Sequence, residues 1–195
     1  RNGMGKTTLM KTLMGIVPTR DGSITVGDVP VTHLKSHKRV ASGLAYVPQG
    51  RQIFSSMTVE ENVETGLTVT GRKSVPGDIY ELFPVLLEMK NRRGGNLSGG
   101  QQQQLAIARA LASSPKVLLL DEPTEGIQPS IIREMARTLR RIRDDRGLTI
   151  VVSEQVLSFA LDVADRVLVL EKGTFVHDSP RAGIDEAKVS KFLSV

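Results

Sequence analysis

Short apolar runs alternate with longer stretches in which apolar residues recur every three or four positions along much of the chain. The short runs are typical of buried strands, and the longer stretches of helices with one apolar face. Strands and helices that alternate in this way favour an α/β fold with a mostly parallel sheet. We expect strands at 23–26, 44–47, 117–120, 148–152 and 167–170, helices at 6–14, 100–112, 130–146 and 156–164, and a small antiparallel hairpin completed at 174–177.

The stretch 58–99 has a different pattern, because no strand-like run occurs in it. Thr58 followed by Glu61 is the signature of a capping box at the start of a helix. Apolar residues then recur periodically over 79–89. We therefore expect 58–99 to form a helical subdomain inserted into the α/β core of one domain, 1–195.

Composition limits the class of protein. With 195 residues, 39% of them apolar, the chain is long enough for one domain with a core. It has no cysteine, which fits a reducing cytoplasm. No apolar stretch approaches the roughly 18 residues of a membrane-spanning helix.

The net charge of +5 raises the question of nucleic-acid binding. The basic residues are spread along the chain and lack interleaved aromatic residues. Their densest cluster lies in 130–146, where an opposite apolar stripe predicts a solvated helix face. We therefore expect no nucleic-acid partner.

The segment Gly3–Thr8 reads Gly-Met-Gly-Lys-Thr-Thr, as in a phosphate-binding loop. Its glycines let successive backbone amides point at a phosphate, and the following helix adds its positive end. We expect Lys6 to contact the β- and γ-phosphates and the Thr7 hydroxyl to bind Mg²⁺. The alternative is a glycine-rich turn that only begins a helix. The expected nucleotide contacts are Asn2, Gly3, Gly5, Lys6, Thr7 and Thr8.

The full loop motif also needs an opening glycine, which would precede residue 1, and a strand before it. We therefore expect the sequence to begin inside the motif, without the N-terminal strands of the domain.

Asp121 and Glu122 follow the apolar run 117–120. Ligands of open α/β sheets bind at the carboxyl ends of strands, where this run places the two acids. Side chains alternate along a strand, so we assign the acids different roles. Asp121 is expected in the Mg²⁺ shell, and Glu122 is the candidate base for the attacking water. The alternative is a polar strand end that enters a turn.

A second candidate anion site is Leu97–Gln101, which reads Leu-Ser-Gly-Gly-Gln at the start of a helix. Ser98, Gly99, Gly100 and Gln101 there offer a hydroxyl and exposed amides at a positive helix end. Ser98 could equally be an ordinary helix cap. Because one chain can hardly use both sites on one triphosphate, we expect each ATP to lie between two subunits.

The ordered set Gly3–Thr8, Gln49, Leu97–Gln101 and 117–122 resembles the nucleotide-binding domain of ABC transporters over essentially the whole chain. The resemblance implies a P-loop NTPase fold, the cofactors ATP and Mg²⁺, and ATP hydrolysis coupled to transport. It also implies that Gln49 contacts Mg²⁺, takes part in catalysis and senses a membrane partner.

At two positions the sequence departs from the usual pattern of the family, and these departures restrict the resemblance to one group of its members. Gln155 stands where the family usually has a histidine that contacts the γ-phosphate, and 125–128 reads Glu-Gly-Ile-Gln instead of the usual Ser-x-Leu-Asp. Both features look like the ATP-binding subunits of branched-chain amino acid importers and their urea-transporting relatives. The amino-acid sequences of 49–54, 58–62 and 152–158 are most similar to those of the urea-transporting relatives.

These resemblances imply a cytoplasmic ATPase, peripheral on the cytoplasmic face of the inner membrane, that powers uptake of urea or a branched-chain amino acid. The implied partners are a second nucleotide-binding subunit, identical or not, integral membrane permease subunits and, indirectly, a periplasmic solute-binding protein. A non-transport relative remains an alternative, although the short spacing from Gln49 to Leu97 leaves no room for a coiled coil. A kinase or GTPase is disfavoured because the chain has no N-K-x-D motif. A catalytically inactive nucleotide-binding fragment is the last alternative.

Overall fold

The centre of the fold is a three-stranded parallel sheet in the order β3-β4-β5, seen in the computed structural model, which describes residues 3–184. Val117 of β4 lies opposite Leu44 of β3 and Thr149 of β5, so the three carboxyl ends finish at the same edge. The segments that follow the strands are therefore brought together. The strands are β3 (Leu44–Val47), β4 (Val117–Asp121) and β5 (Thr149–Ser153).

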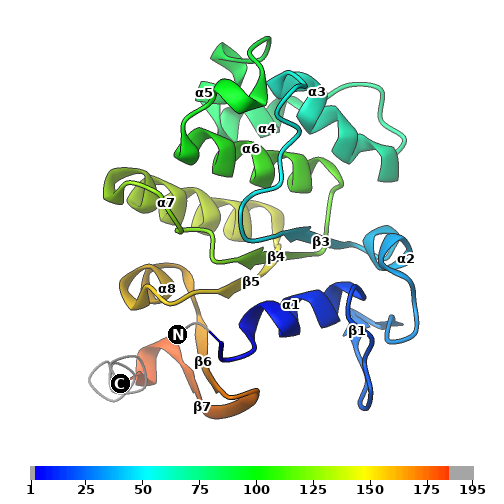
Figure 1. Cartoon of the computed structure of the whole chain (residues 1–195), viewed down its shortest axis with the longest axis vertical. Helices are drawn as coiled ribbons and strands as arrows, with labels where there is room; N and C mark the ends of the chain where they lie inside the picture. Colours follow the sequence, from blue (N-terminus) through cyan, green and yellow to red (C-terminus); the bar gives the residue numbers. More distant parts are fainter. Residues whose placement is uncertain (1–2, 185–195) are drawn as a thin grey trace.

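Both faces of this sheet are covered by helices (Figure 1). Leu118 and Leu120 of β4 belong to the larger core, with the buried residues of α6 and α7. Leu119 points the other way and packs with Met10 and Met14 of α1. This alternation, with the first four β4 positions, 117–120, all apolar, is expected of a strand buried on both faces. The covering helices are α1 (Lys6–Met14), α6 (Gly99–Ala112) and α7 (Pro129–Arg146).

Between β3 and α6 the described elements are all helical, and they lie at one end of the molecule (Figure 1). The capping box at Thr58 is confirmed: its hydroxyl accepts the Glu61 amide, and the Glu61 carboxylate accepts the Thr58 amide. The periodic stretch 79–89 forms two helices, because Pro84 begins the second and Phe83 leaves the helical conformation. The elements are α3 (Val59–Glu64), η1 (Thr65–Val69), α4 (Gly77–Leu82), α5 (Pro84–Glu88) and η2 (Gly94–Asn96).

The remaining elements surround α1 and the edge of the sheet. The expected C-terminal hairpin is present as an antiparallel pair, β6 with β7. The expected strand at 23–26 is shorter and pairs with a second short strand, and the small helix α2 was not predicted. These elements are β1 (Thr25–Val26), β2 (Val29–Pro30), α2 (Ser36–Ala41), α8 (Leu157–Val163), β6 (Arg166–Glu171), β7 (Thr174–Pro180) and η3 (Arg181–Gly183).

The fold class is therefore confirmed as α/β, with parallel strands at the centre and antiparallel strands at the side. Among residues 3–184, no helix is both long and apolar enough to cross a bilayer.

Candidate functional site

The loop before α1 is shaped by two glycines in the left-handed region. Gly3 has φ 75° and Gly5 has φ 98°, backbone angles that L side chains rarely adopt. Gly5 is the N-cap of α1 and has no side chain with which to cap the first turn of that helix. The loop is tied to the β6–β7 turn by the Gly173 amide, which donates to the Met4 carbonyl over 3.0 Å. The positive end of α1 is therefore available to an external anion.

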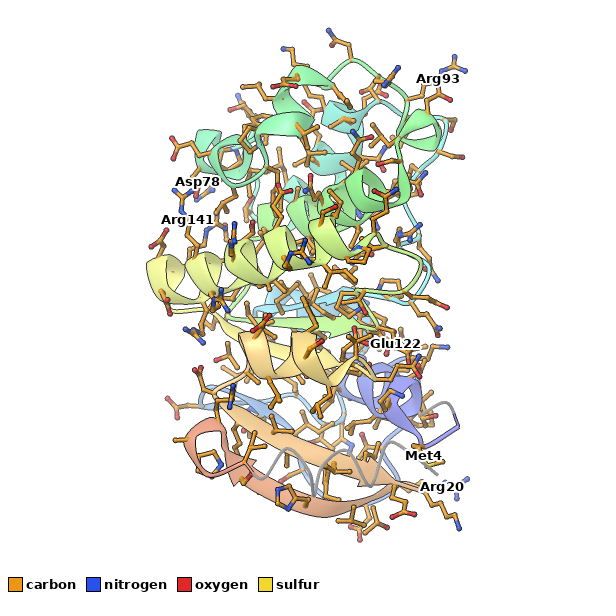
Figure 2. The ribbon with its side chains drawn as sticks, turned by 90° about the vertical axis from the view of Figure 1, so that its left-hand side faces the viewer. Met4, Arg20, Asp78, Arg93, Glu122 and Arg141 are labelled. Carbon is orange, nitrogen blue, oxygen red and sulfur yellow. The ribbon has the colours of Figure 1, made fainter. Side chains whose placement is uncertain are left out.

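A cavity of about 330 Å³, which we call the phosphate cavity, lies over this loop. Its volume is within the size range of small-molecule sites. Gln49, which follows β3, and Glu122, which follows β4, join the loop in its wall. Figure 2 shows Glu122 and Met4 on the same side of the molecule, next to α1. The residues predicted to bind the phosphates, to activate the water (Glu122) and to sense the membrane partner (Gln49) thus line one cavity. Its lining consists of Gly3, Met4, Gly5, Lys6, Thr7, Thr8, Gln49 and Glu122.

Glu122 contacts two other predicted site residues. One of its carboxylate oxygens lies 3.1 Å from the Lys6 ammonium, and the other accepts the Gln155 side-chain amide over 3.1 Å. The Glu122 side chain is only 6% exposed, so the ion pair is largely withdrawn from solvent and its two members compensate each other's desolvation. A phosphate entering the cavity would compete with Glu122 for Lys6.

The backbone at Glu122 is unusual as well. Its φ of 47° places a non-glycine residue in the left-handed region, which is costly and recurs at functional sites. Its amide donates to the carbonyl of Ser153 at the end of β5. This bond continues the β4–β5 ladder and holds the turn that carries Glu122 against the turn that carries Gln155.

Asp121 lies deeper than Glu122, at 1% exposure, and is not part of the cavity wall. The Ser153 hydroxyl donates to one of its oxygens, and the Tyr46 hydroxyl donates to the other over 3.3 Å. Burial is the main cause that raises the pKa of the Tyr46 hydroxyl, and the negative charge of Asp121 adds to it. Tyr46 therefore keeps its proton and stays a hydrogen-bond donor. Asp121 is thus held in place by one side chain from each neighbouring strand.

The segment Leu97–Gln101 begins α6, away from the phosphate cavity. Ser98 is the N-cap: its hydroxyl accepts the Gln101 amide, and the Gln101 side chain accepts the Ser98 amide over 2.9 Å. Packing favours glycine at position 100, because a Cβ on Gly100 would lie 2.8 Å from the Ile131 side chain. No residue of this segment lines the cavity that holds Gly3–Thr8.

Two arginines that sequence reasoning missed hold the segment after Gln49. Arg51 and Gln52 both have positive φ, and Arg51 donates to the Glu125 carbonyl over 2.9 Å. Arg109 of α6 donates to the Gln52 carbonyl over 2.9 Å and lies over the Phe54 ring. The segment after Gln49 is thereby connected both to α6 and to the turn after Glu122. No local pattern in the sequence signals these contacts.

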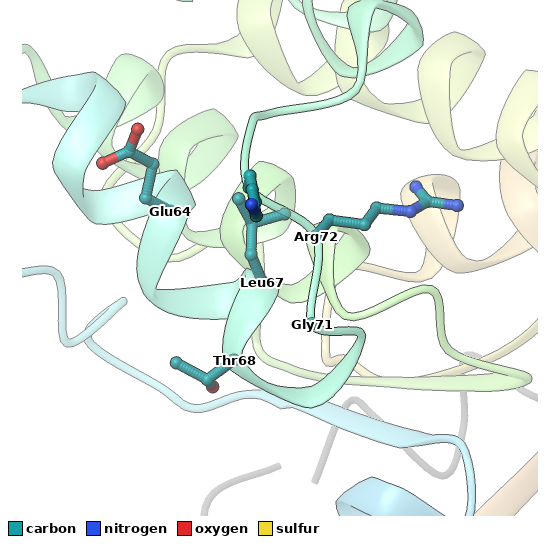
Figure 3. A pocket seen from close by; sticks show the side chains of 6 residues that line it. Glu64, Leu67, Thr68, Gly71 and Arg72 are labelled. Atoms are coloured by element: carbon teal, nitrogen blue, oxygen red, sulfur yellow. The ribbon is translucent and has the colours of Figure 1, made fainter.

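A second cavity, of about 300 Å³, lies in the helical part (Figure 3). It is lined by the end of α3, by η1 and by the loop after η1, with side chains of both charges, among them Glu64, Arg72 and Lys73. None of the predicted site residues contributes to it.

The structure thus brings together Gly3, Gly5, Lys6, Thr7, Thr8, Gln49, Glu122 and Gln155, keeps Asp121 just behind them, and places Ser98–Gln101 elsewhere. Asn2 lies outside the described residues. In the described part of the chain, no group of three or more His, Cys, Asp or Glu side chains is placed to hold a metal ion.

A parallel sheet with a glycine-lysine loop at its carboxyl edge and an acid on the next turn defines a P-loop nucleotide-binding protein. The family model described as "ABC transporter" matches residues 1–125. The high-affinity branched-chain amino acid transport ATP-binding protein BraG of Pseudomonas aeruginosa is 42% identical over 192 residues, which cover 96% of this chain and 82% of that protein. The probable branched-chain amino acid transport ATP-binding protein LivF of Archaeoglobus fulgidus is 35% identical, over 88% of this chain and 74% of that protein.

Among solved structures, a dimeric ATP-binding cassette in a post-hydrolysis state with ADP and phosphate superposes with a TM-score of 0.82 at 24% identity, over 94% of this chain and 84% of that one. A nucleotide-free ATP-binding cassette from an ABC transporter superposes with a TM-score of 0.79 at 23% identity, over 100% of this chain and 82% of that one. At this identity the likeness concerns the fold.

The chain belongs to the ABC transporter family. It is an ABC-type ATPase, which binds ATP and couples its hydrolysis to transport.

Proposed function

We propose that this chain is the ATP-hydrolysing subunit of an importer for branched-chain amino acids. The observation that carries the proposal is that Glu122, in the wall of the phosphate cavity, contacts Lys6 with one carboxylate oxygen and Gln155 with the other. The names of the relatives from Pseudomonas aeruginosa and Archaeoglobus fulgidus support the class of solute. Urea uptake, which the wording of 49–54 favours, remains a prediction beside it.

In this proposal the phosphates of ATP lie on the loop before α1. Gly3 and Gly5 present backbone amides, and the first turn of α1 adds its positive end. Lys6 leaves Glu122 and binds the β- and γ-phosphates, which are stronger partners because they carry more charge. The ion pair between Lys6 and Glu122 is thereby exchanged for one between Lys6 and the nucleotide.

Glu122, once released, is the base for the attacking water. Its buried position and its contact with the Gln155 amide fix the direction of the carboxylate. Gln155 can donate to a γ-phosphate oxygen, but it cannot take up a proton near neutral pH. Gln49, which also lines the cavity, completes the surroundings of the water.

The residues present fit Mg²⁺, which binds ATP enzymes through few protein ligands and keeps phosphate oxygens and waters. The absence of a larger acidic cluster in residues 3–184 agrees with this preference. Thr7 and Gln49 would hold the ion directly, and Asp121 through water, since both Asp121 oxygens already accept hydrogen bonds. The ion would neutralise phosphate charge as the bond to the leaving group breaks.

The proposed partners follow from the position of Ser98–Gln101 outside the phosphate cavity. In a dimer with a second nucleotide-binding subunit, this helix end would face the ATP of the other subunit. Permease subunits in the inner membrane, a periplasmic solute-binding protein and a position on the cytoplasmic face of that membrane complete the proposal.

The test is ATP hydrolysis by the complete transporter in proteoliposomes, with its solute-binding protein loaded with leucine, urea or no solute. We expect leucine to raise hydrolysis several-fold over the unloaded binding protein. Stimulation by urea alone would replace the proposed solute. Stimulation by neither would contradict an importer of this class. Lys6→Ala, which removes the phosphate contact, is the matched control and is expected to abolish the response.

A further inference from the structure

Glu154 lies directly before Gln155 but plays no part in the phosphate cavity. Its carboxylate accepts four hydrogen bonds from two separate turns. One oxygen accepts the hydroxyl and the amide of Thr124, over 2.7 and 3.3 Å. The other accepts the amides of Gln155 and Val156, over 2.7 and 3.0 Å. A single side chain therefore joins the turn after β4 to the turn after β5.

These two turns carry Glu122, which lines the phosphate cavity, and Gln155, which bonds to it. Glu122 stands two residues before Thr124, and Gln155 follows Glu154 directly. The Gln155 side chain reaches the Glu122 carboxylate over 3.1 Å. The geometry of this contact depends on how the two turns are placed, and the Glu154 carboxylate bonds to both of them.

The surroundings strengthen the bonds between Thr124 and Glu154 in particular. Thr124 is 5% exposed, so these bonds are partly shielded from water, whereas the bonds to the Gln155 and Val156 amides are exposed. Hydrogen bonds to a carboxylate are stronger than neutral ones, and a low local dielectric strengthens them further. By contrast, Gln155 itself is exposed, and its side chain bonds to the Glu122 carboxylate.

The backbone conformation of Glu122 is a second reason why the two turns need to be held together. Its φ of 47° is disfavoured for a residue with a side chain, and such a conformation persists only where the surrounding contacts fix it. On one side the Glu122 amide is held by the Ser153 carbonyl. On the other side Thr124 is held by Glu154, which closes the turn between the two bonds.

We propose that Glu154 is a positioning residue for ATP hydrolysis. By joining Thr124 to the backbone amide of Gln155, it keeps the side-chain amide of Gln155 on the Glu122 carboxylate. Glu154 acts through Gln155 and does not touch the nucleotide. The proposal rests on the roles given to Glu122 and Gln155 in the proposed function.

The test compares Glu154→Ala in two backgrounds, the unchanged chain and Gln155→Ala, in the complete transporter. In the unchanged chain we expect Glu154→Ala to lower kcat by about tenfold or more, because misplaced catalytic groups lose rate steeply. The Kd for ATP should change less than about twofold, since no cavity residue is altered. In the Gln155→Ala background, Glu154→Ala should change kcat less than about twofold.

Two further variants keep this test decisive. Thr124→Val removes only the hydroxyl donor and leaves the Glu154 bonds to Gln155 and Val156, so it should reproduce the loss of kcat even if Glu154→Ala does not fold. Asp162→Ala removes an exposed acid from α8, the helix that begins after Val156, and should leave kcat unchanged.

An equal fall in kcat in both backgrounds would mean that Glu154 supports the structure generally, and would overturn the proposal. Full turnover in both Glu154→Ala and Thr124→Val would overturn it too. The proposed function fails differently, since it is contradicted if the unchanged chain does not bind ATP.

Discussion

Replacing Arg39 by methionine tests how the helix behind the phosphate loop is held. The Arg39 side chain is 2% exposed and donates to four backbone carbonyls. Two of them, at Thr12 and Leu13, belong to the last turn of α1, over 2.9 and 2.7 Å. The other two, at Leu34 and Thr32, lie in the segment before α2, over 3.0 and 2.6 Å. Arg39 thus satisfies the C-terminal end of α1, whose other end lines the phosphate cavity.

The magnitude follows from counting the carbonyls that lose a partner. The Thr12 carbonyl also accepts the Gly15 amide, which leaves three that depend on Arg39. A buried acceptor without a partner costs about 1 kcal/mol at the low end. The low end applies because burial lowers the pKa of Arg39, so the variant recovers the cost of burying a charge. Arg39→Met should therefore lower the free energy of unfolding by about 3 kcal/mol.

The assay is urea unfolding followed by far-UV circular dichroism, with the free energy extrapolated to water. Lys38→Met, one position earlier in α2, is the matched control because Lys38 is exposed. It should change the free energy of unfolding by less than about 0.5 kcal/mol. A loss in Arg39→Met no larger than in Lys38→Met would refute the role given to the four carbonyl contacts.

Two further predictions concern the site and its support. Gln155→His should add an inflection near pH 6.5 to the pH dependence of kcat, since imidazole has a pKa of about 6.5 and glutamine does not ionise; profiles without this difference would contradict the position given to Gln155. Asn62→Ala should lower the free energy of unfolding by about 2–4 kcal/mol, because this fully buried side chain bonds Phe54, Met57 and Thr58. Urea unfolding measures the loss, and a change below about 1 kcal/mol would show that the segment 54–58 does not depend on Asn62.

The sequence predicted those parts of the fold that local patterns determine. The strand 117–120 is an uninterrupted apolar run, and the structure buries it between two helical layers. The helix 6–14 is bounded by glycines, and both ends lie where they were predicted. Helix α2 was missed because Ser36–Ala41 has little apolar periodicity. It is held instead by Arg39 through carbonyls up to 27 positions away.

The candidate site shows the same division. Lys6 and Glu122 were predicted from motifs and Gln155 from the family resemblance, and the structure places both Lys6 and Gln155 in contact with Glu122. The bond between Thr124 and Glu154 joins residues 30 positions apart, on two turns whose distance depends on strand register. Sequence spacing alone could not reveal it. The left-handed conformation of Glu122 is likewise a product of the bonds around it, since no glycine marks the position.

We propose that Glu122 activates the water that attacks ATP. The single-turnover rate of ATP hydrolysis by Glu122→Gln in the complete transporter measures this role, with Glu134→Gln, which replaces an exposed acid on α7, as the control. We expect Glu122→Gln to bind ATP at least as tightly as the unchanged chain, since Lys6 is released from its ion pair. Its hydrolysis should be slower by about 10²–10⁴-fold, the usual contribution of a general base. Hydrolysis in Glu122→Gln at the rate of Glu134→Gln would show that Glu122 is not the base.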